Sequence, residues 1–411
     1  MLIDLDNCVV ANYDFLMNQS VQLRAVFFIG GYDPKTPEAF FKRLRKEIAR
    51  FDSLWDNRSV VSPVETPKES SVGKVTIQTS NAQENWSTKT DFHFLTLDRI
   101  VLDDFSRPLP VRLGKYVRAF GDFVVSGTAF HFFRSAWRFG LYFLYPFLAL
   151  ALFAFGGYLT AHLTSPWLGF MGWIVGFLVF SLALVVLGKR WSTNHLMDLW
   201  SFSLSFIRGR RPDAESLMQH FAEDIVKRVS DEKYDEVILI GHSTGGMLML
   251  DVAARCVSLD AAFSTRAPKV SLLTLGSTAL KAGYHPAGKR FRERVQRLAE
   301  DQKLEWVEIQ CLTDVINFYK TDPVREMQLR PAVGKEFPVI RQVRMKDMLL
   351  AETYSRVKRN LFRVHYQYIF GNTKRYWYDF FQICCGPLSL SERARNHISG
   401  SGKPPEKVNL Q

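Results

Sequence analysis

The chain of 411 residues is long enough to bury one large core or two smaller ones, and we expect one domain with an insert. Its formal net charge of +12 and pI near 9.4 favour an anionic neighbour. The lysines and arginines carry no nucleic-acid motif, so we favour a bilayer surface over nucleic acid. The five cysteines are odd in number and lack zinc-like spacing, which excludes a disulfide framework and indicates a reducing compartment.

The N-terminal part of the chain predicts the start of a buried sheet. Val21–Ile29 ends in an apolar run of strand length and stops at Gly30-Gly31-Tyr32. Pro37 opens an amphipathic helix that runs to about residue 51. The pieces 75–77 and 92–95 have the β-branched and aromatic composition of further strands of the same sheet.

The segment 111–200 has the composition of a membrane-associated insert. Residues 111–139 are basic and aromatic, as in segments that lie against a membrane surface. From Phe139 to Gly188 there is no Asp, Glu, Lys or Arg, so the segment predicts a transmembrane hairpin rather than two helices of a soluble core. Two apolar stretches, each near the ~20 residues that cross a hydrocarbon core, fit inside it: Leu141–Leu163 and Trp167–Leu187, with Thr164–Pro166 as the break.

Charged and small residues around the predicted hairpin indicate its orientation and its packing. Arg134 and Arg138 precede it and Lys189-Arg190 follows it, whereas the connecting loop has neither lysine nor arginine. The positive-inside rule therefore places both ends, and the rest of the chain, in the cytoplasm. Gly172 and Gly176 form a small-residue face on which the two helices can pack.

The most informative stretch is YDEVILIGHSTGGMLMLDVAARC, at Tyr234–Cys256. Val237–Ile240 form a short apolar run typical of a strand buried on both faces, and Met247–Cys256 shows helical spacing. Between them stands the pattern Gly-x-Ser-x-Gly, which holds a serine hydroxyl on a strained strand-to-helix turn. The flanking glycines allow strand and helix to approach where a side chain would collide. Ser243 is therefore the predicted nucleophile, and a buried serine in an ordinary turn is the alternative.

On these residues the sequence resembles the α/β-hydrolase superfamily, in particular lipases and esterases with a GHSxGG nucleophile elbow. The resemblance implies an α/β fold with a mostly parallel sheet and helices on both faces, here interrupted by the two-helix transmembrane hairpin. It also implies an oxyanion hole of backbone N–H groups, one from the residue after the nucleophile and one from the loop after an early strand. The matching positions are Thr244 and either Gly31 or Tyr32, although that loop alone could be a plain Gly-Gly turn.

The chain on both sides of this elbow alternates strands and helices. Asp213 can cap a helix that runs to about residue 229. Val270–Leu275 and Leu304–Leu312 predict strands, and Pro286–Asp301 between them predicts an amphipathic helix. This alternation is what a mostly parallel sheet with helical crossovers requires.

A serine hydroxyl needs a histidine to take its proton and a carboxylate to orient that histidine. The resemblance implies the chain order serine, acid, histidine, and three histidines follow Ser243. His285 precedes the strand expected to carry the acid, and His397 lies in a polar tail. His365 is therefore the predicted general base.

Two aspartates are candidates for the triad acid. Asp314 directly follows the strand Leu304–Leu312, at the strand end where parallel sheets place their sites. Asp322 is the alternative, but it stands before Pro323, as in an ordinary turn. We prefer Asp314. The sequence contains no phosphate-loop lysine, dinucleotide fingerprint or metal-ligand cluster, so we expect no cofactor and no metal.

These elements predict four regions: residues 1–110 and 201–390 as the two parts of a hydrolase domain, 111–200 as the membrane-associated insert, and 391–411 as a flexible polar tail. The predicted function is a membrane-anchored serine hydrolase of lipase or esterase type, which cleaves a lipophilic ester such as an acyl lipid through an acyl-enzyme on Ser243. An acyltransferase with the same triad and a non-catalytic, membrane-anchored interaction protein are the alternatives. The expected partners are the ester and the lipid bilayer, not nucleic acid, and the sequence leaves the oligomeric state open.

Overall fold

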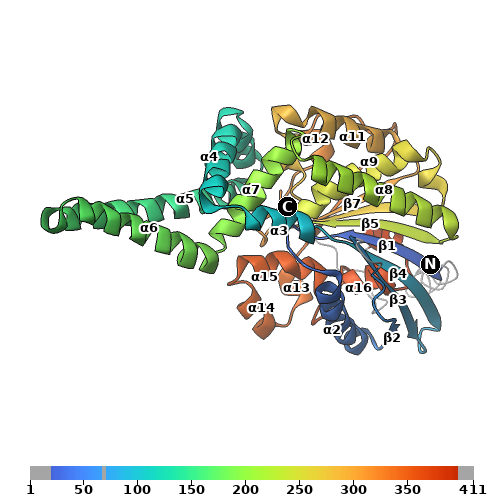
Figure 1. Ribbon diagram of the computed structural model, residues 1–411. Coiled ribbons are helices and arrows are strands. Elements are labelled where there is room, and N and C mark those ends of the chain that lie inside the picture. Colours follow the sequence, from blue (N-terminus) through green and yellow to red (C-terminus); the bar gives the residue numbers. More distant parts are fainter. Residues whose placement is uncertain (1–19, 67–70, 397–411) are drawn as a thin grey trace, which may run out of the picture. The chain divides into compact units, whose positions relative to one another are not determined.

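The computed structural model describes residues 20–66 and 71–396 (Figure 1). The chain forms two compact units. Of the described residues, the first unit combines those up to Val101 with 213–283 and 289–396, and the second contains Leu102–Pro212 with Tyr284–Gly288. The second unit is wider than the expected insert 111–200, because the helices on both sides of the apolar pair pack against that pair.

An eight-stranded sheet forms the centre of the first unit. Its order is β2-β3-β4-β1-β5-β6-β7-β8. The strands from β4 to β8 in this order are parallel, and β3 pairs antiparallel with both of its neighbours, β2 and β4. The strands are β1 Leu23–Ile29, β2 Arg58–Val61, β3 Val72–Asn81, β4 Trp86–Leu95, β5 Glu236–His242, β6 Lys269–Leu275, β7 Glu305–Cys311 and β8 Val339–Val343. The predicted α/β class with a mostly parallel sheet is confirmed. The sequence pattern misses β2 and β8, because both are short edge strands with partly exposed side chains.

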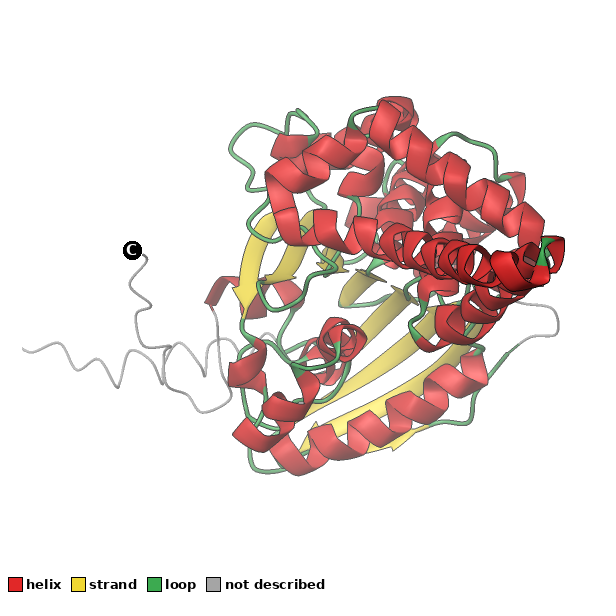
Figure 2. Cartoon of the chain, turned by 90° about the vertical axis from the view of Figure 1, so that its left-hand side faces the viewer, coloured by secondary structure: helices red, strands yellow, loops and turns green. Residues whose placement is uncertain are grey.

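Helices cover both faces of this sheet (Figures 1 and 2). One face packs against α2 and the C-terminal helices in one large apolar core, and α9 packs against the other face. The helices of the first unit are α2 Pro37–Trp55, α8 Pro212–Asp231, α9 Thr244–Leu259, α10 Leu280–Gly283, α11 Lys289–Glu300, α12 Pro323–Glu326, α13 Met345–Met348, α14 Ala351–Val357, α15 Leu361–Tyr366, α16 Phe380–Cys385 and α17 Leu390–Asn396. Helices on both sides of a parallel sheet are what its crossover connections produce.

The sequence sets both ends of α2. Thr36 is its N-cap, with the side-chain oxygen accepting from the backbone N–H of Ala39, and Pro37 occupies the first turn. The helix ends four residues later than predicted, at Trp55, and Asp56 adopts the left-handed conformation after it. The apolar face of α2 packs into the core, with Phe40, Leu44 and Ile48 buried there.

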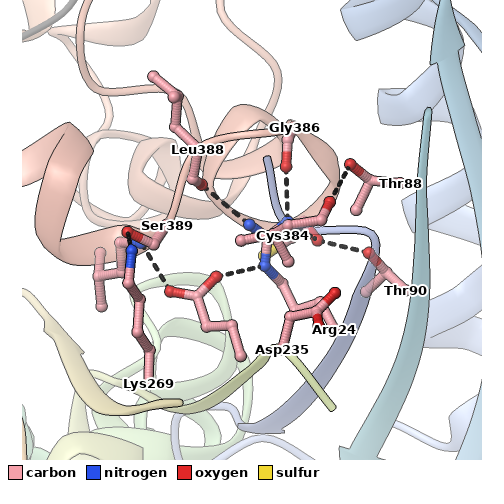
Figure 3. A network of polar contacts seen from close by, with 12 residues as sticks. Arg24, Thr88, Thr90, Asp235, Lys269, Cys384, Gly386, Leu388 and Ser389 are labelled. Carbon is pink, nitrogen blue, oxygen red and sulfur yellow. Dashed lines mark hydrogen bonds and ion pairs between the residues drawn. The ribbon is translucent and has the colours of Figure 1, made fainter. Parts of the chain in front are cut away.

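A buried ion pair fixes the C-terminal part of the chain to the starts of two central strands (Figure 3). Arg24 Nε donates to Glu236 Oε2 at 2.6 Å, and both side chains are fully buried. The other guanidinium N–H groups donate to the backbone oxygens of Cys384, Gly386 and Leu388 at 2.8–3.1 Å. Removal of either partner would leave an uncompensated buried charge, so this network is expected to stabilise the fold strongly.

Helix α17 occupies the first residues of the segment 391–411, where the sequence predicts a flexible tail. Glu392 in this helix accepts from Lys269 Nζ at 2.8 Å. Ser389, just before the helix, accepts from the same amine at 2.9 Å (Figure 3). These contacts bind α17 to the start of β6, so residues 391–396 are part of the folded unit. Residues 397–411, including His397, lie outside the described residues.

The second unit is helical where the structure describes it. Its helices are α3 Asp98–Ser106, whose first residues belong to the first unit, α4 Leu109–Val125, α5 Thr128–Leu168, α6 Phe170–Arg190 and α7 Thr193–Ile207. Helices α5 and α6 are each long and apolar enough to cross a membrane, by length and composition. In Figure 1 they lie side by side.

The turn between α5 and α6 lies at Gly169 and not at the predicted break Thr164–Pro166. Pro166 lacks the N–H that would bond to His162 O, and the hydroxyl of Ser165 donates to that oxygen at 3.2 Å instead. The helix therefore continues through the proline. It ends where Gly169 adopts a φ of 56°, a conformation that glycine accepts without strain.

Helices α5 and α6 pack along small residues. A Cβ at Gly157 would lie 2.8 Å from the backbone oxygen of Gly176, and a Cβ at Gly172 would lie 2.6 Å from Ser165 N. Only glycine allows the two backbones to approach so closely. The outward positions carry large exposed apolar side chains, among them Leu148, Leu152, Phe155, Leu163, Phe170, Phe177 and Leu182.

Candidate active site

Ser243 stands at the sharp turn between β5 and α9. Its backbone has a φ of 61° and a ψ of −125°, which a residue with a side chain rarely adopts. Ser243 N donates to Leu275 O at 3.0 Å, and Ser243 O accepts from the N–H groups of Gly246 and Thr278 at 3.0 and 3.1 Å. These bonds hold the strained turn against the end of β6. Ser243 is buried, with 8% of its surface exposed.

The glycines around Ser243 allow three backbone segments to meet. A Cβ at Gly245 would collide with the backbone oxygens of Ile29 and Gly30, at the end of β1. A Cβ at Gly241 would lie 2.5 Å from Gly245 O. Because neither position has a side chain, the start of α9 lies directly against the loop that follows β1.

This loop and the first turn of α9 surround the nucleophile. A Cβ at Gly31 would lie 3.5 Å from Ser243 Cβ and 3.7 Å from Ser243 Oγ, so the loop backbone is beside the serine. Thr244 is the first residue of α9, and the N–H of a first helical residue has no acceptor within its helix. Tyr32, the third predicted oxyanion residue, follows Gly31 and is buried.

Asp314 and His365 form a buried pair. His365 Nδ1 lies 2.8 Å from Asp314 Oδ2, and Asp314 Oδ1 accepts from Ile316 N at 2.9 Å. Since the carboxylate accepts, the proton of the neutral imidazole is on Nδ1 and the lone pair is on Nε2. In the part of the chain that the structure describes, the buried Nε2 has no hydrogen-bond partner. This nitrogen is therefore available to take a proton.

The other predicted candidates lie elsewhere. Asp322, the alternative acid, caps α12 and accepts from the backbone N–H groups of Val324 and Arg325 at 2.9 and 3.1 Å. His285 belongs to the second unit, where its Nε2 lies 2.8 Å from Asp122 Oδ1. The structure thus brings His365 to Asp314 and not to Asp322.

His242 connects the nucleophile turn to the histidine of the pair. Its Nε2 lies 2.9 Å from His365 O, and the two imidazole rings are 4.6 Å apart. Because a carbonyl oxygen only accepts, His242 donates from Nε2. Burial and the neighbouring His365 hold the pKa of His242 well below its usual range, so the ring stays neutral. The side chain before Ser243 therefore positions the segment that carries His365.

The end of β6 lies between the nucleophile turn and the Asp-His pair. A Cβ at Gly276 would lie 3.0 Å from Asp314 Oδ2 and 3.2 Å from His365 Cε1. The preceding Leu275 accepts the hydrogen bond from Ser243 N. Both parts of the predicted triad therefore lie against the same strand end.

Lys281 is a residue of this site that the sequence pattern did not reveal. It lies in α10, after β6, and is 1% exposed. Its Nζ donates to Thr244 Oγ1 at 3.2 Å. Burial lowers the pKa of the Lys281 amine to about 7. A lone lysine in the apolar stretch just after a strand end is the signal that could have identified it.

A small cavity of about 20 Å³ opens beside the loop after β1. Its polar side includes Asp33, which accepts from Lys35 Nζ and from the Tyr366 hydroxyl, both at 2.9 Å. Its lining residues are Phe28, Gly30, Gly31, Asp33, Lys35, Phe40, Arg43, Phe94, Leu95, Leu97, His242, Tyr366 and Ile369. The cavity has apolar walls and a charged rim, and its lining residue Gly31 lies beside Ser243.

A family model described as "Alpha/beta hydrolase family" matches residues 123–366, which is more than half of the chain. The matched range contains Ser243, Asp314 and His365. It begins within the second unit, so it does not include β1 and the loop that carries Gly31. No curated protein and no solved structure matches the chain.

Proposed function

The chain belongs to the alpha/beta hydrolase family, and we propose that it is a serine hydrolase that cleaves a carboxylic ester through an acyl-enzyme on Ser243. The observation that carries this proposal is the 2.8 Å contact between His365 and Asp314 at the strand end that holds the Ser243 turn. A serine hydroxyl is a weak nucleophile at neutral pH, and an oriented histidine is the base that activates it.

In the proposed mechanism, His365 Nε2 takes the hydroxyl proton as Ser243 Oγ attacks the ester carbonyl carbon. Asp314 keeps the imidazole in the required tautomer and stabilises the imidazolium that forms. The backbone N–H groups of Thr244 and of Gly31 or Tyr32 bind the negative oxygen of the tetrahedral intermediate. The imidazolium then protonates the leaving alcohol. Water attacks the acyl-enzyme in the same manner, which releases the acid and restores Ser243.

We also propose that α5 and α6 anchor the protein in a membrane, with the active site on the cytoplasmic side. The support is the large exposed apolar surface of these helices, which is unfavourable in water. Lys189 and Arg190 lie in the last turn of α6, whereas the turn at Gly169 carries no lysine or arginine. An anchored enzyme of this kind meets apolar esters within the bilayer, so an acyl lipid is the proposed substrate class.

The test of the catalytic proposal is covalent labelling of the purified full-length protein with a fluorophosphonate probe. We expect labelling of the wild type and its loss in Ser243→Ala. Ser264→Ala is the matched control, because Ser264 has the same 8% exposure but lies in the segment after α9. Labelling that persists in Ser243→Ala, or that disappears in Ser264→Ala, would contradict the assignment.

A further inference from the structure

A cavity in the second unit gathers positive charge from three segments of the chain. Its lining residues are Asp104, Arg107, Arg112, Lys115, Asp198, Ser201, Phe202, Ser205 and Arg211, from α3, α4, α7 and the turns after α3 and α7. Four of these side chains are cationic and two are carboxylates, so the cavity carries an excess of positive charge. Hydroxyl groups and one aromatic ring complete the lining.

The arginines of this cavity form ion pairs with both of its carboxylates. Arg211 contacts both oxygens of Asp104, at 2.8 and 3.0 Å, and Arg107 contacts Asp104 at 2.8 Å. Arg112 binds Asp198 with two nitrogens, and the Tyr116 hydroxyl donates to the same carboxylate at 2.8 Å. The arginines are thus held in place by partners that also neutralise part of their charge.

Lys115 is the cation of this cavity without such a partner. Among residues 20–66 and 71–396, no carboxylate lies within ion-pair distance of its amine. Burial lowers the pKa of Lys115, and repulsion from Arg107 lowers it further, while Asp104 opposes the shift. A bound anion would relieve this repulsion, so the cavity favours a negatively charged ligand.

Hydrogen bonds connect the cavity to the end of α6. Asn194 Nδ2 donates to Leu184 O at 3.0 Å, and the Tyr116 hydroxyl lies 3.2 Å from Asn194 O. The same hydroxyl donates to Asp198 in the cavity wall. Leu184 lies in the last two turns of α6, which ends at Lys189-Arg190. The cavity is therefore close to the point where the apolar helix ends.

We propose that this cavity binds the phosphate group of an anionic membrane lipid. This inference rests on the proposed membrane anchoring by α5 and α6, because lipid headgroups lie where an anchoring helix ends. Arginine side chains match the several oxygens of a phosphate better than a single point charge does. Since the cavity is small, the phosphate lies at its mouth. There the half-buried Lys115 can turn toward it, and Arg107, whose side chain is 26% exposed, adds positive charge beside it.

The test measures thermal unfolding of the full-length protein in mixed micelles that contain phosphatidylglycerol. We expect phosphatidylglycerol to raise the unfolding temperature of the wild type and phosphatidylcholine to leave it unchanged. Lys115→Met should lose at least tenfold in apparent affinity for phosphatidylglycerol. Arg118→Met is the matched control, because Arg118 is exposed on the same helix and does not line the cavity.

Three outcomes would overturn the proposal. The first is an equal rise in unfolding temperature for Lys115→Met and Arg118→Met, and the second is an equal rise with the two lipids. The third is a rise of the same size with soluble glycerol 3-phosphate, which would show a site for free phosphate esters. Carbonate extraction of membranes from cells that express the wild type tests the anchoring separately. Fluorophosphonate labelling of Lys115→Met tests the active site separately, and we expect that labelling to remain.

Discussion

Asp314 Oδ2 lies 2.8 Å from His365 Nδ1, although the two residues are 51 positions apart in the chain. The contact joins the turn after β7 to the last turn of α15. The second carboxylate oxygen accepts from Ile316 N at 2.9 Å, so the aspartate is held in place on both sides. Chain order alone allows either Asp314 or Asp322 as the acid. This geometry places Asp314 beside His365.

We expect Asp314→Asn to lower kcat by about 10⁴, because an amide cannot hold the histidine tautomer or stabilise the imidazolium. Asp322→Asn should retain near-normal activity, since asparagine caps a helix about as well as aspartate. Steady-state kinetics of both variants on one ester decide the matter. If Asp322→Asn were the more damaging change, Asp314 could not be the triad acid.

Ser243→Ala and His365→Ala should each lower kcat by several powers of ten, and the double variant should be little worse than either single one. The two side chains act as one unit in the proposed mechanism, so their effects do not add. Circular dichroism should show both variants folded. Additive losses in the double variant would argue that the two residues act independently.

The Lys281 amine should make stability depend on pH. Its pKa is about 7 in the folded protein and near the ordinary lysine value of 10.5 in the unfolded chain, so the unfolded chain binds more protons between these values. Wild-type stability therefore rises with pH in this window, and below it the full cost of burying the charged amine remains. Lys281→Met removes this cost, and its stability relative to wild type should be about 2–3 kcal/mol more favourable at pH 6 than at pH 9.

Denaturant unfolding at the two pH values measures this difference. Lys289→Met is the control, because that lysine side chain is 82% exposed and should show no comparable pH dependence. A pH-independent difference between Lys281→Met and wild type would mean that the amine keeps its charge in the folded protein.

Gly245→Ala should destabilise the protein by about 3 kcal/mol or more, because the added methyl group meets the backbone oxygens of Ile29 and Gly30. Backbone at the end of a central strand cannot move aside as a flexible side chain can. Gly114→Ala, in α4, is the matched control: a Cβ there meets nothing within 4 Å, so alanine should stabilise the helix by ~0.5–1 kcal/mol. Denaturant midpoints of the two variants measure the contrast, and equal effects would contradict the close approach at Gly245.

The anchoring proposal predicts opposite sidedness for two exposed positions. Trp167, 88% exposed near the turn between α5 and α6, should face away from the cytoplasm, and Val333, 97% exposed in the first unit, should face it. In intact cells an impermeant thiol reagent should label Trp167→Cys and should label Val333→Cys only after permeabilisation. The described native cysteines are buried, which keeps their background low. Labelling of Val333→Cys in intact cells would overturn the topology.

Substrate class can be tested with the reconstituted protein. Hydrolysis of a bilayer-embedded acyl lipid should exceed that of a short soluble ester at equal concentration, because the anchored enzyme meets the lipid in the bilayer. Ser243→Ala in the same vesicles measures the uncatalysed background. Activity confined to the soluble ester would remove acyl lipids from the proposal while leaving the triad intact.

The sequence by itself determined the features that depend on neighbouring residues. The apolar runs of the central strands, the glycine-flanked Ser243 and the long charge-free segment of α5 and α6 are all visible as local patterns. Each of these elements can be recognised from its own periodicity and its own turn residues. Local patterns do not reveal short edge strands such as β2 and β8, because only one side of an edge strand is paired and its apolar pattern is weak.

The tertiary structure alone decided which distant residues meet. It placed Asp314 rather than Asp322 beside His365, brought Lys281 to Thr244, and placed the unpaired Lys115 among Arg107, Arg112 and Arg211. It also showed that the turn between α5 and α6 lies at Gly169. The helix continues through Pro166, because the hydroxyl of Ser165 replaces the donor that this proline lacks. Such contacts depend on how packed elements bring side chains together in space. Spacing along the chain does not specify those distances, because packing sets them through many residues at once.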